Sequence, residues 1–201
     1  MDLKEYLDNL NKGLTVQPGS EMYAYMNAVS QEAMRITMEL NTSYHTPEEI
    51  RELFSRLTGK KVDDSFGMFP PFYTDCGKNI EVGKHVFINS GCRFQDQGGI
   101  RIDDGAFIGH NVVLATLNHD FSPDRRAALY PAPIHIGRNV WIGANVTVLP
   151  GVTIGDHSVI AAGAVVSKDI PENVVAAGVP ARVVKTIKEA KAGQAEKEKF
   201  L

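Results

Sequence analysis

One histidine in this chain stands at the start of a long segment that breaks an otherwise regular pattern. His119 follows Asn118 near the beginning of residues 115–133. A long irregular segment within a compact repeat usually carries function. Histidine is also the side chain best suited to take a proton near neutral pH. The position of His119 therefore favours a general base, with an ordinary hydrogen-bonded loop side chain as the alternative.

The pattern that this segment interrupts has a period of six residues. Branched apolar residues recur at every sixth position, and glycine directly follows three of them. Helices have a period of 3.6 residues and simple strands a period of 2, so neither explains the spacing. Short fixed periods are typical of solenoids, in which each repeat buries its apolar side against its neighbours. The six positions are Ile136, Ile142, Val148, Ile154, Ile160 and Val166.

If three hexapeptides make one triangular coil, the apolar positions fall into three stacked columns. The interruptions between Phe94 and Ile102 and between Leu114 and Ile136 then lie at the same corner, after the third column. We therefore predict a mainly β fold, a parallel β-helix with about 4.8 Å per coil and a loop extruded from one corner. The columns are Val82/Ile102/Ile136/Ile154, Ile88/Ile108/Ile142/Ile160 and Phe94/Leu114/Val148/Val166.

Residues 1–65 carry helical patterns instead. Ser20 is a suitable N-cap for a helix from Glu21 to about Asn41, and Thr46 with Glu49 forms a capping-box signature for another helix. We predict an N-terminal helical cap, because an open solenoid end would expose unpaired strand edges. Residues 66–184 form the predicted solenoid, and the charged, alanine-rich residues 185–201 are expected to form a short helical tail.

The composition excludes several classes of protein. The 201 residues carry a formal net charge of −3, without the basic excess typical of nucleic-acid binding. Neither a signal peptide nor an apolar run of membrane-spanning length is present. Cys76, assigned to the foot of the third column, and Cys92 occupy inward positions and are expected to be buried thiols. We therefore expect a cytoplasmic protein that binds neither nucleic acid nor membranes.

Several segments resemble the maltose/galactoside O-acetyltransferases, hexapeptide-repeat acyltransferases with a left-handed β-helix. They are Asn118-His119, Pro133 to Gly137, Asn139 to Gly143 and the stretch from Ile154 to Val184. The resemblance implies an acetyl-CoA-dependent O-acetyltransferase. In that family the residue matching His119 takes the proton from the acceptor hydroxyl, which attacks the thioester directly. The implied acceptor is a sugar or glycoside, and neither an acyl-enzyme nor a metal is required.

The resemblance also implies a set of acceptor-binding positions. Asp96 falls, by the column argument, at the same corner as His119, although a solvated corner carboxylate is the alternative. Glu21 is a candidate for the acid that relatives carry near the N-terminus. The implied positions are Asn89, Asp96, Gln97 and Leu129.

A third set of positions matches the CoA-binding residues of the family. Ala144 and Ala162 each come two residues after a second-column residue, so they are expected to stack, and the Ala144 amide is a candidate oxyanion donor. Basic side chains suit the CoA phosphates. The family is a homotrimer with active sites between subunits, and its tryptophan lines the CoA cleft of a neighbour. The matching positions are Trp141, Ala144, Ala162, Ser167, Lys168, Arg182 and Lys185.

Three other functions fit the solenoid. An acetyltransferase of the same fold could use a non-sugar acceptor, as xenobiotic acetyltransferases do. A γ-class carbonic anhydrase would bind zinc through three histidines, but the columns place the histidines of this chain at different corners. A non-catalytic scaffold would be expected to lack His119, Asn89 and the basic end together. The histidines considered are His85, His110, His119, His135 and His157.

Overall fold

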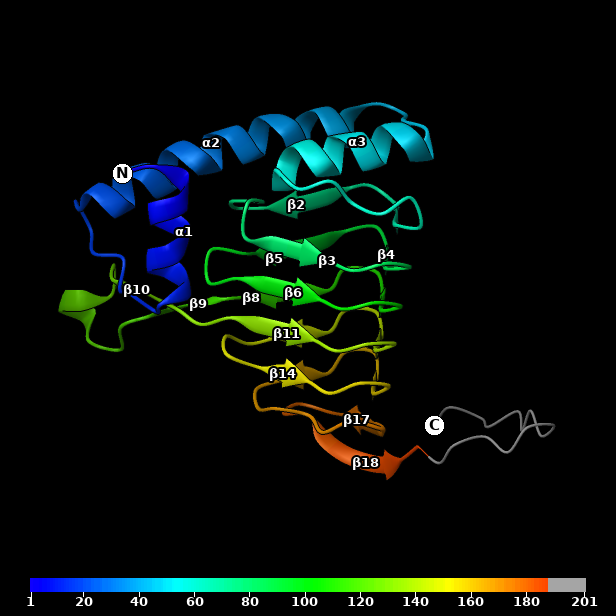
Figure 1. Ribbon diagram of the computed structural model, residues 1–201. Helices are drawn as coiled ribbons and strands as arrows, with labels where there is room; N and C mark the ends of the chain where they lie inside the picture. The colour runs from blue at the N-terminus through cyan, green and yellow to red at the C-terminus, as the bar shows by residue number, and fades with distance from the viewer. Residues whose placement is uncertain (188–201) are drawn as a thin grey trace.

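The six-residue period forms a prism of short parallel strands; two of the three helices cover one end of it, and the first helix lies along its side (Figure 1). The structure, a computed structural model, describes residues 1–187. Each coil contributes one strand to each of three sheets, which we call the first, second and third sheets in the order of the predicted columns. The prediction of a hexapeptide-repeat solenoid with a helical cap is confirmed.

The strand bounds follow the predicted repeat closely. The first sheet contains β3 (Ile80–Val82), β6 (Ile100–Ile102), β11 (Ile134–Ile136) and β14 (Thr153–Ile154). The second contains β1 (Gly67–Met68), β4 (Phe87–Ile88), β7 (Phe107–Ile108), β12 (Trp141–Ile142), β15 (Val159–Ile160), β17 (Val174–Ala177) and β18 (Arg182–Thr186). The third contains β2 (Phe72–Thr74), β5 (Cys92–Gln95), β8 (Val113–Ala115), β13 (Thr147–Val148) and β16 (Val165–Val166).

The register of these strands confirms all three columns. In the second sheet, for example, Ile108 pairs with Ile88 on one side and with Ile142 on the other. The column residues point into the prism, and all except the partly buried Val82 are almost entirely buried there. Their stacked side chains form the core, because each coil buries its apolar side only against the coils above and below.

Glycine in the repeat is required by the close approach of neighbouring coils. A Cβ atom added to Gly143 would lie 2.6 Å from the backbone nitrogen of Ala162. The corresponding atom on Gly109 would lie 2.7 Å from the nitrogen of Ala144. Both contacts are too short for any side chain, and backbone cannot move aside as a flexible side chain can.

The helical cap contains the two helices whose starts the sequence predicts at Ser20 and Thr46. Thr46 and Glu49 form the capping box of α3, which ends at Gly59 in a left-handed conformation. Phe54 of this helix stacks on Phe66 and contacts the edge of Phe72, so the cap and the first coil share one core. The helices are α1 (Leu3–Asn11), α2 (Glu21–Thr42) and α3 (Pro47–Thr58).

The extruded loop is a hairpin that α1 supports. Strand β9 (Leu117–His119) pairs antiparallel with β10 (Leu129–Pro131), and a 3-10 turn, η1 (Pro123–Arg125), closes the loop between them. Helix α1 lies next to the hairpin on the left of Figure 1. A second apolar cluster joins the two elements, and it includes Tyr6, Leu10 and Leu129.

One register and one boundary differ from the prediction. Thr74, not Cys76, pairs with Phe94 in the third column. The reason is that two extra residues lie at the corner between Thr74 and Val82, whereas the prediction placed such an insertion only between Phe94 and Ile102. Lys185 and Thr186 belong to β18, which pairs antiparallel with β17, so the predicted tail boundary falls inside a strand. The rest of the expected helical tail lies outside the described residues.

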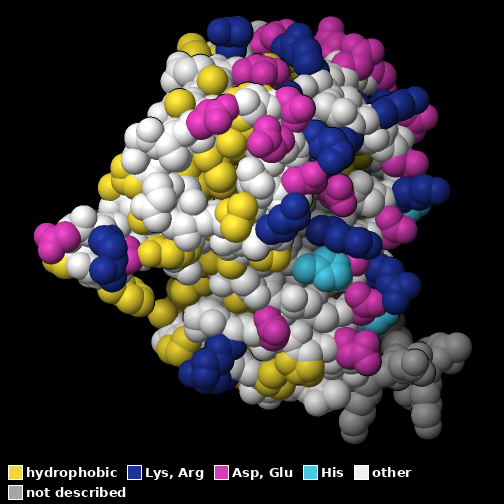
Figure 2. Space-filling model, turned by 60° about the vertical axis from the view of Figure 1, so that its left-hand side comes forward, with side chains coloured by type: hydrophobic (Ala, Val, Ile, Leu, Met, Phe, Trp, Pro, Cys, Tyr) yellow, Lys and Arg dark blue, Asp and Glu magenta, His cyan; other side chains and the backbone are white. Residues whose placement is uncertain are grey.

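The surface carries mixed charge. Figure 2 shows acidic and basic side chains interspersed on one half of this face, with hydrophobic side chains gathered on the other half. Within residues 1–187, no helix combines the length and the hydropathy that crossing a bilayer requires.

Candidate functional site

Two corners of the prism hold nearly all of the predicted site residues. The loop corner, where the chain leaves the third sheet, holds Asp96, Gln97, the hairpin and, further down, Ser167 and Lys168. The alanine corner, where the chain leaves the second sheet, holds Asn89, His110, Ala144 and Ala162. One six-residue edge separates the two corners within a coil.

The imidazole of His119 is fixed by a backbone group of its own loop. Its Nδ1 lies 2.6 Å from the carbonyl oxygen of Arg126. A carbonyl oxygen only accepts hydrogen bonds, so Nδ1 must carry the proton. In the neutral ring Nε2 is therefore unprotonated, and a base needs this tautomer. The side chain is exposed in the single chain, so a substrate can approach it.

Asp120, the next residue, organises the tip of the loop. Its carboxylate accepts hydrogen bonds from the Nε of Arg125, the hydroxyl of Tyr130 and the amide of Ser122. These donors, led by Arg125, hold the pKa of Asp120 well below its ordinary value. The carboxylate is thus charged at neutral pH and keeps its three partners in place.

Asp96 departs from the expectation for an acceptor-binding residue. It lies at the loop corner as predicted, but none of its surface is exposed. Its carboxylate accepts hydrogen bonds from the Thr74 hydroxyl and from the amides of Cys76 and Asn79. Burial raises its pKa, and these donors oppose the rise. Asp96 therefore shapes the corner of the first coil; it is neither a solvated carboxylate nor, in the single chain, within reach of an acceptor.

Asp75 is a carboxylate of this corner that the sequence did not indicate. It is exposed as a residue, but partial burial of its carboxyl group, and then the charge of Asp96, raise its pKa. The side chains of Gln97 and Gln95 hydrogen-bond to it. Gln97 itself is buried, and its Oε1 has no hydrogen-bond partner among the described residues. The correct register of the first coil would have identified Asp75, because it follows Thr74 as Gln95 follows Phe94.

Two further predicted positions have structural contacts. Leu129 lies opposite His119 in the hairpin, but its side chain is only 8% exposed and packs with Tyr6 and Leu10. Glu21 forms an ion pair with the amino group of Met1 at 2.5 Å. Leu129 thus attaches the hairpin to α1 and does not face an acceptor in the single chain.

At the alanine corner, Ala144 and Ala162 stack on each other, and one backbone N–H group has no backbone acceptor within the described coils. The carbonyl of Ala144 accepts a hydrogen bond from the amide of Gly163, so the turns holding Ala144 and Ala162 stack directly, as predicted. Among residues 1–187, the amide of Ala144 donates to no backbone acceptor. Asn89 lies two coils above Ala144, and Arg182 lies opposite Ala177 at the lower end of the row. A preorganised backbone N–H donor at this corner suits a developing oxyanion.

The outward face of the second sheet adjoins this corner and is unusually apolar. Phe107 and Trp141, which pair across neighbouring strands, are 55% and 44% exposed. The same outward row continues through Val159 and Val175 to Lys185. An exposed apolar strip of this kind marks a surface that contacts a partner or ligand.

The single chain therefore brings the predicted residues together in two groups and keeps the groups apart. His119 lies at the loop corner with Ser167 and Lys168, whereas Asn89 and Ala144 lie at the alanine corner. The first group can remove a proton, and the second can stabilise an oxyanion and hold an extended ligand. An acyl transfer that used His119 as base and the Ala144 amide as oxyanion donor would require both groups.

Neither cysteine is placed to act as a nucleophile. Cys76 and Cys92 are buried free thiols. Burial raises the pKa of Cys92 to about 11 and raises the pKa of Cys76 further. Only the thiolate is an effective nucleophile. No group of three or more potential metal ligands comes together in the described part of the chain.

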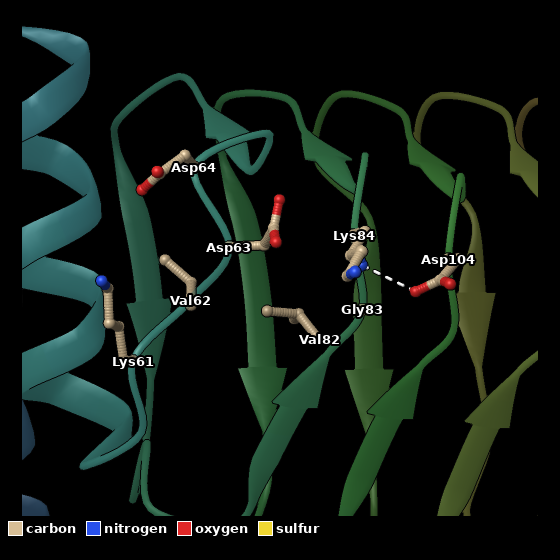
Figure 3. A pocket seen from close by; sticks show the side chains of 8 residues that line it. All are labelled: Lys61, Val62, Asp63, Asp64, Val82, Gly83, Lys84 and Asp104. Atoms are coloured by element: carbon tan, nitrogen blue, oxygen red, sulfur yellow. Dashed lines mark hydrogen bonds between the residues drawn. The ribbon is translucent and has the colours of Figure 1, made fainter.

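The remaining corner of the prism holds a polar cavity of about 510 Å³ (Figure 3). Its charged lining side chains come from residues 61–64 and from the corner turns of two coils. Asp104 accepts a hydrogen bond from the amide of Lys84, and Asp63 accepts one from Ser65. These carboxylates therefore stabilise turns, and the cavity is separate from both groups of site residues.

Comparisons with known sequences find hexapeptide-repeat relatives. The family model described as bacterial transferase hexapeptide (six repeats) matches residues 133–168. The galactoside O-acetyltransferase of Escherichia coli K12 is 42% identical over 151 residues, which is 74% of each chain.

Solved structures show the same architecture. The maltose O-acetyltransferase of Clostridium difficile 630 superposes with a TM-score of 0.83 at 34% identity, over 92% of this chain and 98% of that one. A hexapeptide-repeat acetyltransferase of Vibrio cholerae, solved in complex with acetyl coenzyme A, gives a TM-score of 0.78 at 32% identity. That match covers 92% of this chain and 99% of the other.

Proposed function

The chain belongs to the maltose/galactoside family of hexapeptide-repeat O-acetyltransferases and uses acetyl-CoA as its co-substrate, and we propose that it acetylates a hydroxyl of a sugar or glycoside, with His119 as general base. The observation that carries the proposal is the bond between Nδ1 of His119 and the Arg126 carbonyl. It leaves Nε2 as a proton acceptor on an exposed ring.

The proposed reaction is a direct transfer. Nε2 of His119 takes the proton of the acceptor hydroxyl while the oxygen attacks the thioester carbonyl. The amide of Ala144 donates to the oxyanion that forms. The carbon–sulfur bond then breaks as the carbonyl reforms, and the imidazolium returns the proton to the departing thiolate. The products are the acetyl ester and free CoA.

The two groups of residues are proposed to meet between copies of the chain. The loop corner of one copy would lie against the alanine corner and the exposed apolar row of the next. Packing of this kind buries Phe107 and Trp141 and unites His119 with Asn89 and Ala144. Three such contacts close into a ring, the homotrimer expected for the family, and closed symmetry is the usual outcome for homo-oligomers.

Both sides of the proposed cleft contribute contacts to each of the two substrates. Ala162, Trp141 and the basic residues Lys168, Arg182 and Lys185 are the proposed contacts for CoA, with its phosphates at the basic end. Asn89 remains a proposed acceptor contact, and Asp75 joins it because that residue is exposed, whereas Asp96 and Gln97 are buried.

A thiol-release assay with acetyl-CoA and a panel of acceptors tests the proposal. The panel contains free sugars, alkyl and aryl glycosides, an amino sugar and a non-sugar aromatic alcohol. We expect the glycosides to be acetylated and His119→Ala to lower kcat/KM by about 10²-fold or more, the usual contribution of a general base. His135→Ala is the matched control, because His135 pairs with Asp103 on the first sheet, away from the site.

The outcomes separate the parts of the proposal. Retention of activity in His119→Ala would exclude the base role. Turnover of the aromatic alcohol alone would replace the sugar acceptor by a xenobiotic-type acceptor, while leaving acetyl transfer intact.

A further inference from the structure

The loop that carries His119 contains an arginine whose side chain holds backbone groups, not acids. The guanidinium of Arg126 donates from Nε to the carbonyl of Asp120 at 2.9 Å. It also donates from Nη2 to the carbonyl of Phe121 at 2.8 Å. Both acceptors come directly after His119 in the chain. Arg126 therefore ties the two sides of the loop tip together.

The same residue supplies the carbonyl that fixes the imidazole. Nδ1 of His119 donates to the backbone oxygen of Arg126 at 2.6 Å, across the loop. The side chain of Arg126 reaches across the loop in one direction, and the bond from His119 returns in the other. Neither contact is part of the backbone pairing between β9 and β10. That pairing alone therefore does not set the distance between the His119 ring and the Arg126 carbonyl.

We propose that Arg126 is a positioning residue: its guanidinium clamps the carbonyls of Asp120 and Phe121, and this clamp holds its own carbonyl against Nδ1 of His119. The inference rests on the proposed function, because the clamp matters for catalysis only if His119 is the base. Without the clamp the loop is free to separate from the ring, and water replaces the carbonyl. The neutral imidazole then distributes its proton between both nitrogens, and the fraction with Nε2 unprotonated falls.

Arg125 offers a matched comparison within the same loop. It is an adjacent arginine of similar exposure, but its Nε donates to the carboxylate of Asp120. Asp120 keeps two other donors, Ser122 and Tyr130, when Arg125 is removed. Exposed ion pairs of this kind contribute little. Loss of Arg125 therefore removes the same charge from the loop without opening the clamp.

The test combines kinetics with the tautomeric state of His119. Arg126→Ala, Arg126→Lys, Arg125→Ala and His119→Ala are prepared in the full chain. We expect Arg126→Ala to lower kcat by about 10- to 100-fold, by analogy with the range found for partners that orient a metal-ligating histidine. The KM for acetyl-CoA should change less than about threefold, and lysine, which supplies one of the two bonds, should restore part of kcat. Arg125→Ala should stay within about threefold of the parent.

Nitrogen-15 NMR of the histidine rings provides the second readout, with the His119 signals assigned from their loss in His119→Ala. The parent and Arg125→Ala should show the tautomer protonated at Nδ1, and Arg126→Ala should show a mixture. An unchanged tautomer in Arg126→Ala, or an unchanged kcat, would overturn the inference. If His119→Ala retains activity, the base role fails, yet the NMR comparison still decides whether Arg126 fixes the ring.

Discussion

At the scale of single residues, two neighbouring acids at the loop corner have opposite roles because of their surroundings. Asp96 is enclosed, and its carboxylate accepts hydrogen bonds from amides of the turn above it, in the first coil. Asp75 follows the third-sheet strand of that first coil and is exposed. The charge of Asp96 acts on Asp75 and adds to the burial that raises its pKa. A carboxylate that is costly to ionise and still accessible is typical of a site that binds a ligand.

Asp75→Asn separates function from stability. We expect the KM for the acceptor to rise about tenfold, as for loss of one hydrogen bond to a charged group, with the KM for acetyl-CoA unchanged. The folded-state pKa of Asp75 is raised, so its ionisation opposes folding above that pKa and ceases to do so at acid pH. The substitution should therefore not lower the free energy of unfolding at pH 7. Steady-state kinetics and urea denaturation check both parts; a destabilised variant would assign Asp75 a structural role.

At the scale of elements, the repeat depends on the close stacking of corner turns. Gly143 has a neighbouring backbone where its Cβ would be. Ala161 follows Ile160 as Gly143 follows Ile142, yet it carries a side chain. Strand β17 pairs with β15 in the next coil, but the chain then turns back at Gly178 and forms the antiparallel β18, so the corner after β17 does not repeat the turn that stacks Ala162 on Gly143. The path of the next coil thus decides where glycine is required.

Gly143→Ala and Ala161→Gly test this explanation as a pair. The first should lower the free energy of unfolding by about 2 kcal/mol or more, because the added methyl group meets fixed backbone. The second should cost less than about 1 kcal/mol, the usual cost of added backbone entropy. Urea denaturation monitored by circular dichroism measures both. Equal costs would show that backbone flexibility, not coil spacing, explains the glycine.

At the scale of the whole molecule, the prism separates the proposed base, His119, from the proposed oxyanion donor, the amide of Ala144. The loop corner carries His119, the alanine corner carries Ala144, and the apolar row with Phe107 and Trp141 lies beside the latter. A site shared between copies explains both the separation and the exposed aromatic side chains. It also means that the loop network of one copy determines the activity of a cleft on another.

Mixing two inactive variants tests the shared site. His119→Ala removes the base, and Ala144→Trp fills the channel at the alanine corner. Refolded together, they should recover activity, because some clefts then combine the intact corner of each chain. Each cleft of the closed ring takes its loop corner from one chain and its alanine corner from the next. With equal amounts and random assembly, each corner is intact in half of the cases, so about a quarter of the clefts are intact. Mixtures as inactive as either variant would place a complete site within one chain.

Periodic burial is the part of this protein that its amino-acid sequence specifies without help from the fold. The six-residue spacing defined the columns, the two interruptions located the loop, and the Thr46 capping box marked α3. Each is a local pattern whose physical meaning does not depend on distant residues. The inward side chains can be buried only when each coil stacks on its neighbours. These features therefore follow from the order of the residues alone.

The corners of the prism, in contrast, depend on how the chain closes on itself. Whether a corner side chain points inward or outward depends on hydrogen-bond donors from another coil. The Asp96 carboxylate, for example, points inward to the amides of Cys76 and Asn79. The tautomer of His119 depends on a carbonyl seven residues away across the loop. These are non-local relations, and a one-dimensional pattern does not contain them.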